Sequence, residues 1–245
     1  DIQVLNEAAR EGRYDVTAIS MAAYPELADD YYLLPIGASV GDGFGPAVVV
    51  APDSPYQTMA DLCGKTVAVP GINTSAYYAA KGVLPDFDPD PTYFLDIPEK
   101  VLSGEVDAGI LIHELQMDPS RAGLRKLTDL GTEWRKLYNL PLPLGGNVIN
   151  RRLGPELCQQ VGNLLKQSIE WGLASRESTL AVALEEATSS VDTIAGDRYI
   201  DMYVNQDTLQ LSHAVTAGIR QLMHLGAQHG LCRAVDVKSN VIQLS

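Results

Sequence analysis

Short runs of apolar residues alternate along the chain with segments whose apolar positions recur at helical spacing. Residues 65–70 ("KTVAVP") are rich in residues that favour strands. The segment behind them, residues 71–82 ("GINTSAYYAAKG"), carries side chains that favour a helix start. A strand, a turn and a helix are therefore predicted here, and repetition of this order indicates α/β architecture with largely parallel sheets.

Two segments in the second half of the chain have the periodicity of amphipathic helices. Residues 154–173 begin with Pro155 near the first turn, where proline is well tolerated. Their apolar side chains recur at helical spacing and are Leu157, Val161, Leu164, Leu165 and Ile169. Residues 212–230 have the same pattern, through Val215, Ile219 and Leu222. Both segments predict helices that pack on the core.

A short internal repeat is the most informative pattern in the sequence. Residues 5–20 ("LNEAAREGRYDVTAIS") and 98–113 ("PEKVLSGEVDAGILIH") each hold a helical stretch, a glycine, two further residues, an aspartate and an apolar strand. The glycines, Gly12 and Gly104, suit a left-handed residue that ends a helix before the strand begins. Each copy therefore predicts the end of one strand–helix–strand layer.

The repeat places two strand ends in equivalent positions. When the copies are aligned on their aspartates, Ser20 falls on Ile112, and His113 follows directly. Ligands of open α/β sheets bind beyond the carboxyl ends of strands, so both ends are expected to border one cleft. His113 is then a candidate general base, because the unperturbed pKa of histidine lies near neutrality. A structural role for a single histidine at a strand end is the alternative.

The two copies differ in what precedes them. A strand and a helix, starting at about residue 65, stand before the second copy, whereas only residues 1–14 precede Asp15. A lobe without its opening strand would leave backbone groups unpaired. We therefore expect that the first lobe lacks its opening strand and helix in this sequence and that an upstream segment supplies them.

Composition excludes several classes of protein. The 245 residues are 46% hydrophobic, enough for a globular core, and the net charge of −13 without a basic stretch argues against nucleic acid as a partner. No apolar run approaches the roughly 20 residues of a membrane span, and the first 20 residues do not resemble a secretory signal. The odd set of cysteines without a CxxC spacing, Cys63, Cys158 and Cys232, favours a reducing compartment, so the cytoplasm is expected.

Further candidate chemistries depend on local context. Thr74 and Ser75 stand where a strand turns into a helix, whose free N–H groups attract a carboxylate or phosphate; an ordinary helix cap is the alternative. The glycine-rich residues 41–46 ("GDGFGP") lead into a strand and not into a helix, which excludes a dinucleotide loop. His224 and His229 are five residues apart and diverge on a helix, so no metal site is predicted.

Three segments, in the same order, resemble one family. They are residues 104–114 ("GEVDAGILIHE"), 127–146 ("LTDLGTEWRKLYNLPLPLGG") and 203–206 ("YVNQ"), and they are similar to the menaquinone-biosynthesis proteins of the futalosine pathway, most closely its dihydroxynaphthoate-forming branch. The resemblance covers nearly the whole chain. It implies a two-lobed fold similar to type II periplasmic binding proteins, used in the cytoplasm as an enzyme. It also implies that cyclic dehypoxanthinyl futalosine is cleaved to 1,4-dihydroxy-6-naphthoate and a sugar-derived fragment.

The resemblance assigns roles to individual residues. The histidine of the family's Ile-Ile-His-Glu motif corresponds to His113, which becomes the catalytic base. The Thr-Thr-Ala helix start corresponds to Thr74, Ser75 and Ala76, and the first two are expected to hold the substrate carboxylate. The family's strand that ends in serine corresponds to Ser20, which is expected to contact the substrate from the opposite lobe.

Two further substrate contacts and several departures follow from the same comparison. Gly145 and Gly146, at the end of the segment 127–146, are also expected to bind substrate.

The sequence departs from the family pattern at several positions. The family's opening Ser-x-Cys-Pro-Asn-Asp segment is absent, and the family's lysine two residues before the serine at position 20 is replaced by Ala18. The Ser-Arg-Phe after His-Glu is replaced by Leu115, Gln116 and Met117. These changes affect the expected substrate specificity.

The sequence therefore predicts an α/β protein of two lobes with two mixed sheets. Residues 1–52 and 147–245 form the first lobe and residues 53–146 the second, and two crossing segments, 45–52 and 141–148, form a hinge that permits closure. The predicted activity is a lyase reaction without cofactor or metal on a small carboxylate substrate. The alternatives are a non-catalytic solute-binding protein for a small carboxylate and a chorismate dehydratase, and the sequence does not predict an oligomeric state.

Overall fold

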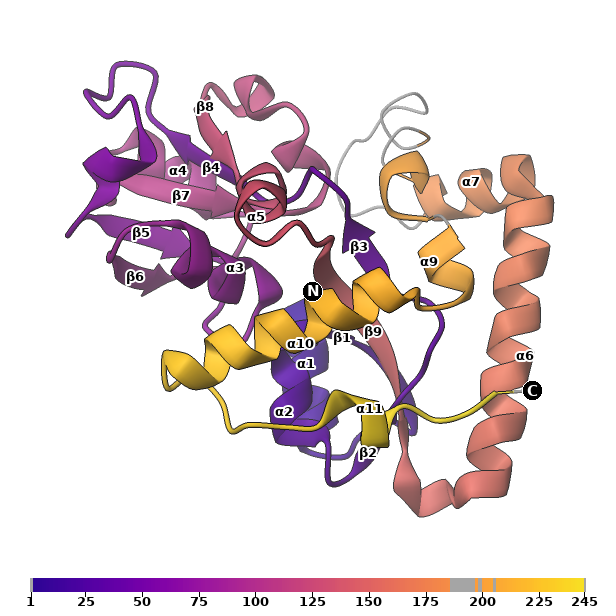
Figure 1. Ribbon diagram of the computed structural model, residues 1–245. Coiled ribbons are helices and arrows are strands. Elements are labelled where there is room, and N and C mark those ends of the chain that lie inside the picture. Colours follow the sequence, from indigo (N-terminus) through magenta and orange to yellow (C-terminus); the bar gives the residue numbers. More distant parts are fainter. Residues whose placement is uncertain (1, 186–196, 198–199, 205, 245) are drawn as a thin grey trace.

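The first of two β-sheets is built around one long strand. The computed structural model describes residues 2–185, 197, 200–204 and 206–244, and Figure 1 shows the arrangement of the elements. Strand β9 (Leu142–Asn150) pairs with β1 (Val16–Ser20) on one side and with β2 (Tyr31–Leu33) on the other, and β3 (Ser39–Gly41) also pairs with β9. All of these described pairs are antiparallel.

The second sheet has five strands in the order β6-β5-β7-β4-β8. Strand β5 pairs in parallel with β6 and β7, whereas β4 pairs antiparallel with β7 and β8. This sheet is therefore mixed. Its strands are β4 (Ala47–Val50), β5 (Thr66–Val69), β6 (Asp88–Pro91), β7 (Ala108–Leu111) and β8 (Arg125–Asp129).

The α/β fold with two sheets is confirmed, and two details of it differ from the prediction. Only the second sheet is mixed, since β9 begins where the chain returns from the second sheet and so runs opposite to β1, β2 and β3. The lobe boundary expected after residue 52 is also too late, because β4 pairs within the second sheet. Likewise β9 joins the first sheet from Leu142, ahead of the expected boundary at 147.

Helices cover both sheets and connect them. They are α1 (Ile2–Arg10), α2 (Tyr24–Leu27), α3 (Ser75–Val83), α4 (Ile97–Leu102), α5 (Leu130–Tyr138), α6 (Pro155–Ala174), α7 (Arg176–Glu185), α9 (Gln206–Leu209), α10 (His213–Gln228) and α11 (Val237–Asn240). Short 3₁₀ turns include η1 (Met21–Ala23) and η3 (His113–Gln116). Helix α10 contacts both α3 and β9, so it packs across the junction of the sheets (Figure 1).

The two helices predicted from periodicity differ in how much they bury. Helix α10 buries Val215, Ile219 and Leu222 completely, as expected of a core helix. Helix α6 begins at Pro155 as predicted, but Leu164 is 64% exposed and only its other face packs on a small cluster. Figure 1 shows the reason, since α6 lies along the outer edge of the first lobe with neighbours on one side.

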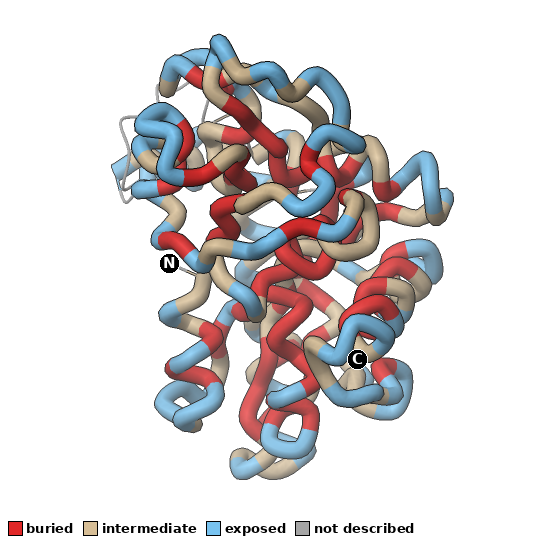
Figure 2. The backbone as a smooth tube through the Cα atoms, turned by 90° about the vertical axis from the view of Figure 1, so that its left-hand side faces the viewer, coloured by how far each residue is buried: buried red, intermediate tan, exposed pale blue. Residues whose placement is uncertain are grey.

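One hydrophobic core extends through both sheets. Its buried members include Ile19 and Val148 of the first sheet, Val48 and Val67 of the second, and Ile219 of α10. In Figure 2 the buried backbone forms a continuous path through the middle of the molecule. The two lobes are therefore joined by close packing as well as by their two connections.

The glycines of the internal repeat have the predicted backbone conformation. Gly12 has φ of +65° and Gly104 has φ of +74°, both in the left-handed region. Each follows the helix end by two residues, after α1 and α4 respectively, and each donates its N–H to a helix carbonyl, of Ala9 and Val101. The repeat therefore marks two equivalent helix-to-strand joints.

Replacing Gly104 with alanine tests this role of the left-handed residue. No atom lies within 4 Å of an added Cβ, so Gly104→Ala changes backbone strain alone and should lower the free energy of unfolding by about 1 kcal/mol. The matched control is Gly172→Ala in helix α6, where the backbone is not left-handed and the change should be neutral or stabilising. Urea denaturation measures both, and equal effects would contradict the assignment.

Candidate functional site

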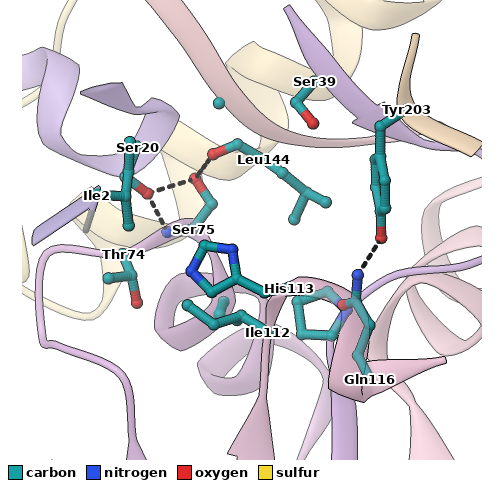
Figure 3. A pocket seen from close by; sticks show the side chains of 13 residues that line it. Ile2, Ser20, Ser39, Thr74, Ser75, Ile112, His113, Gln116, Leu144 and Tyr203 are labelled. Carbon is teal, nitrogen blue, oxygen red and sulfur yellow. Dashed lines mark hydrogen bonds between the residues drawn. The ribbon is translucent and has the colours of Figure 1, made fainter. Parts of the chain in front are cut away.

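A cavity of about 180 Å³ lies where the two sheets meet, and we call it the pocket. Ser20, at the end of β1, and Ile112, just after β7, both line it, so the two strand ends of the repeat do share one cleft. Figure 3 shows the lining side chains. They come from both lobes and are Ile2, Ser20, Ser39, Pro46, Thr74, Ser75, Ala76, Ile112, His113, Gln116, Leu144, Gly145 and Tyr203.

Two buried serines connect the lobes at one end of the pocket. The Ser75 N–H donates to Ser20 Oγ at 2.7 Å, and the two hydroxyl oxygens are 3.1 Å apart. Ser75 Oγ donates to the Leu144 carbonyl at 2.6 Å and accepts from the Ala22 N–H at 3.1 Å. Since the Ser75 hydroxyl proton is used on Leu144, the Ser20 hydroxyl is the donor between the serines. We call this set of four residues the serine link.

Asn6 supports the serine link from helix α1, and sequence reasoning missed it. Its side chain is fully buried, its Oδ1 accepts from the Ser20 N–H at 2.8 Å, and its Nδ2 donates to the Asn73 carbonyl at 3.4 Å. One carboxamide thus joins the end of β1 to the loop before α3. The only feature of the sequence that could have indicated this role is the position of Asn6 on an otherwise apolar helix face. An analysis of hydrophobic periodicity treats such a residue as an exception to the apolar pattern and does not single it out.

Helix α3 begins at Ser75, as predicted, with Thr74 as its N-cap. Thr74 Oγ1 accepts from the Tyr77 N–H at 3.3 Å and donates to the Gly71 carbonyl at 2.7 Å. The Ser75 amide, expected to contact a carboxylate, is already taken by Ser20 Oγ. A carboxylate oxygen that reaches this amide must therefore displace the Ser20 hydroxyl.

The two glycines expected to bind substrate lie on opposite faces of β9. Gly145 pairs with Ser20 and lines the pocket. Gly146 is absent from the lining, and a Cβ on it would come within 2.7 Å of the Met21 side chain in the core. Successive strand residues point to opposite faces, so Gly146 makes room for core packing, and its expected contact with substrate stays a prediction.

His113 lies in the pocket with an unusual backbone and a neighbouring aromatic ring. It is the first residue of η3 and has φ of +59°, which a non-glycine residue adopts rarely. Its imidazole lies 4.6 Å from the Phe94 ring, measured between centroids. Its Nε2 is buried and has no hydrogen-bond partner among the residues that the structure describes.

Burial decides the charge of His113. Loss of solvation lowers the pKa of its imidazole below the usual value near 6.5, and the negative charge of Glu114 opposes this only in part. The ring is therefore largely neutral at pH 7, and no described residue pairs with its Nε2. A neutral imidazole of this kind is the form that accepts a proton in general-base catalysis.

The opposite end of the pocket contains a polar pair that sequence reasoning did not predict. Gln116 Nε2 donates to the Tyr203 hydroxyl at 2.6 Å, and the two residues are only 4% and 5% exposed. Tyr203 packs edge-on against Phe44, with 5.3 Å between ring centroids.

The residues that depart from the family pattern lie in different places. Gln116 lines the pocket, whereas Ala18 is exposed on β1 and Leu115 packs on the core of the second sheet.

The described residues form neither a metal-binding cluster nor a membrane-spanning helix. Within the described ranges, no three His, Cys, Asp or Glu side chains lie close enough together to hold a metal ion. The helices in those ranges include none that is both long and apolar enough to cross a bilayer.

Comparison with known proteins adds three findings. Residues 1–228 match the model of a family described as menaquinone biosynthesis. The chain is 33% identical over 241 residues to 1,4-dihydroxy-6-naphthoate synthase of Streptomyces coelicolor, covering 96% of this chain and 83% of that protein. The crystal structure of protein AF1704 from Archaeoglobus fulgidus is similar with a TM-score of 0.86 and 38% identity, covering 94% and 85% of the two chains.

A more distant structural relative identifies the fold. The alkanesulfonate-binding protein SsuA of Xanthomonas axonopodis pv. citri has a TM-score of 0.72 at 20% identity, covering 98% of this chain and 84% of that one. At this identity the likeness concerns the fold alone. The two-lobed fold similar to that of periplasmic binding proteins is therefore confirmed.

The serine link makes a testable contribution to stability. Ser75→Ala leaves the Ala22 N–H and the Leu144 carbonyl unpaired in a buried region, so the free energy of unfolding should fall by about 1 to 3 kcal/mol. Ser103→Ala is the matched control, since that hydroxyl is exposed and should contribute less than about 0.5 kcal/mol. Denaturant titration of both variants measures the difference, and similar losses would show that the link does not hold the lobes together.

The burial of His113 predicts a pH dependence of stability. Its pKa is lower in the folded than in the unfolded chain, so below about pH 6.5 the unfolded chain binds the proton more readily. The contribution of the neutral ring is then fully present above pH 6.5 and is lost as the pH falls toward the folded pKa. We therefore expect the unfolding free energy of the wild type, taken relative to that of His113→Asn, to fall between pH 8 and pH 5. A relative value that stays constant over this range would contradict the expectation.

Proposed function

Because the chain belongs to the menaquinone biosynthesis family, we propose that it is a carbon–carbon lyase of the 1,4-dihydroxy-6-naphthoate synthase type. Its substrate would be cyclic dehypoxanthinyl futalosine. The observation that carries the proposal is the position of His113, which lines the pocket with a buried ring nitrogen that has no partner in the described part of the chain. The similarity to the Streptomyces coelicolor enzyme over 96% of this chain supports it independently.

The proposed chemistry needs one base and no redox partner. His113 takes a proton from a substrate hydroxyl, the oxygen forms a carbonyl, and the adjacent carbon–carbon bond breaks with its electrons moving into the bicyclic ring system. Aromatisation of the naphthoate drives this retro-aldol step. The low pKa of His113 supports this role, since the ring is unprotonated and ready to accept the proton at neutral pH.

The other end of the pocket is proposed to hold the carboxylate. Thr74 and the Ser75 amide stand at the start of helix α3, whose N-terminus favours negative charge. Ser20 Oγ occupies the Ser75 amide in the described conformation, so substrate binding exchanges this contact for one with the carboxylate. Gly145 lies beside Ser20 on β9 and leaves space for the ligand.

This exchange connects binding with movement of the lobes. The serine link joins the end of β1 in the first lobe to the start of α3 in the second. We propose that residues 42–46 and 139–141, the connections between the two sheets, act as the hinge on which the lobes adjust when the carboxylate enters.

The three free cysteines support a cytoplasmic location for the reaction, because thiols persist in a reducing compartment.

Two alternatives have less support. A chorismate dehydratase would not use this histidine, and a histidine turned away from the cleft would have favoured that activity, whereas His113 lines the pocket. A solute-binding protein shares the fold, but relatives such as SsuA are only 20% identical, so they carry no argument about function.

The direct experiment is incubation of the purified protein with cyclic dehypoxanthinyl futalosine, followed by chromatographic detection of 1,4-dihydroxy-6-naphthoate. Product formation supports the lyase. Saturable binding of the substrate without product would favour the solute-binding protein, and consumption of chorismate would favour the dehydratase.

Replacement of His113 separates catalysis from binding. His113→Ala removes the base and little of the carboxylate site, so turnover should fall by about a hundredfold or more while substrate affinity is retained. His224→Ala is the matched control, since it removes an exposed imidazole on α10 and should keep full turnover. Steady-state kinetics and calorimetric binding measure the two effects. Normal turnover per folded molecule of His113→Ala would end the catalytic assignment.

A further inference from the structure

The pocket has two polar ends separated by an apolar stretch. The serine link and Thr74 form one end, and Gln116 with Tyr203 forms the other. Figure 3 shows His113 between them, with the side chains of Ile112 and Leu144 nearby. If the carboxylate occupies the first end, the second end faces a different part of the same substrate.

At the second end, Gln116 has hydrogen-bonding capacity that the described residues do not use. Gln116 uses one N–H on the Tyr203 hydroxyl, and its Oε1 has no hydrogen bond to any described residue. This oxygen is not one of the fully buried side-chain atoms without a partner, so a ligand or water in the pocket can reach it and donate to it. Gln116 is 96% buried and lines the pocket, so a bound molecule is well placed to do so.

The chemistry of this end selects a hydroxyl group. A carboxamide offers both an acceptor and a donor, which a hydroxyl can match in either orientation of the amide. An anion would face the Gln116 oxygen with no compensating lysine or arginine among the described residues that line the pocket. A purely apolar group would leave the carboxamide unsatisfied. Of these three classes of ligand, only a hydroxyl satisfies both groups of the carboxamide.

We propose that Gln116, positioned by Tyr203, binds a hydroxyl of the sugar-derived part of the substrate, opposite the carboxylate end. This assignment rests on the proposed lyase function, because it names the part of that substrate which the second end holds. It makes Gln116 a specificity-determining residue and Tyr203 a positioning residue.

The position of Gln116 in the chain supports the assignment. Gln116 and His113 are the last and first residues of the same 3₁₀ turn, η3. Residues three apart in such a turn lie on one side, so a group held by Gln116 is brought close to the base. The retro-aldol step requires the base to meet a hydroxyl of the sugar-derived part, which is the group that Gln116 would hold.

The proposal predicts a difference between substrate and product. The product, 1,4-dihydroxy-6-naphthoate, keeps the carboxylate but lacks the sugar-derived part. Gln116→Leu should therefore raise the KM for cyclic dehypoxanthinyl futalosine about tenfold or more, since it removes the hydrogen-bonding groups at similar size. The Kd for the naphthoate should change by less than about twofold.

Tyr203→Phe tests the positioning role. It removes the hydroxyl that orients Gln116 and keeps the ring against Phe44, so the KM should rise several-fold with the naphthoate Kd unchanged. Combined with Gln116→Leu it should add almost nothing, because both changes act on one contact. Tyr138→Phe is the matched control, since it removes a tyrosine hydrogen bond to the Gly82 carbonyl outside the pocket and should keep the wild-type KM.

The outcomes separate this inference from the proposed function. If the wild type forms naphthoate but Gln116→Leu keeps a normal KM, the hydroxyl site is wrong and the lyase assignment stands. If Gln116→Leu weakens naphthoate and substrate equally, Gln116 shapes the pocket as a whole and the assignment of a hydroxyl subsite is overturned. If the wild type forms no naphthoate, the lyase function fails first, and the assignment of this end to its substrate fails with it.

Discussion

The serine link is the interaction on which the arrangement of the site depends. Through it the end of β1 and the first half of β9, both in the first sheet, are fixed relative to the start of α3 in the other lobe. Each polar group in it satisfies another, so no water or ion is needed in a buried region. Asn6 extends the same network into α1. The pocket is the space that remains beside this contact.

The rest of the site follows from burial without charge. The described residues that line the pocket include no lysine or arginine, and the chain as a whole carries a net charge of −13. A carboxylate ligand must therefore be held by neutral donors and by the N-terminus of helix α3, which are effective where water is excluded. The same exclusion of water keeps His113 neutral. One property, desolvation, is thus the basis of both proposed steps, the binding of an anion and the removal of a proton.

The fold supplies positions, and the side chains at those positions determine the chemistry. A scaffold shared with sulfonate-binding proteins brings the ends of strands from two sheets to one cleft. Here one of those ends continues into a 3₁₀ turn that carries His113 and Gln116. The left-handed backbone of His113 is a local strain of the kind found at functional sites. Ile112, directly before it, packs against the continuous core beneath both sheets.

The sequence by itself determined the features that depend on neighbours in the chain. The left-handed glycines Gly12 and Gly104, the start of α3 at Ser75 and the strand end before His113 follow from backbone preferences and short-range periodicity. Only the tertiary structure decided which side chains meet. Ser20 and Ser75 are 55 residues apart, and Gln116 and Tyr203 are 87 apart. Local pattern carries no information about such pairs, because their hydrogen bonds exist only once both sheets are packed together.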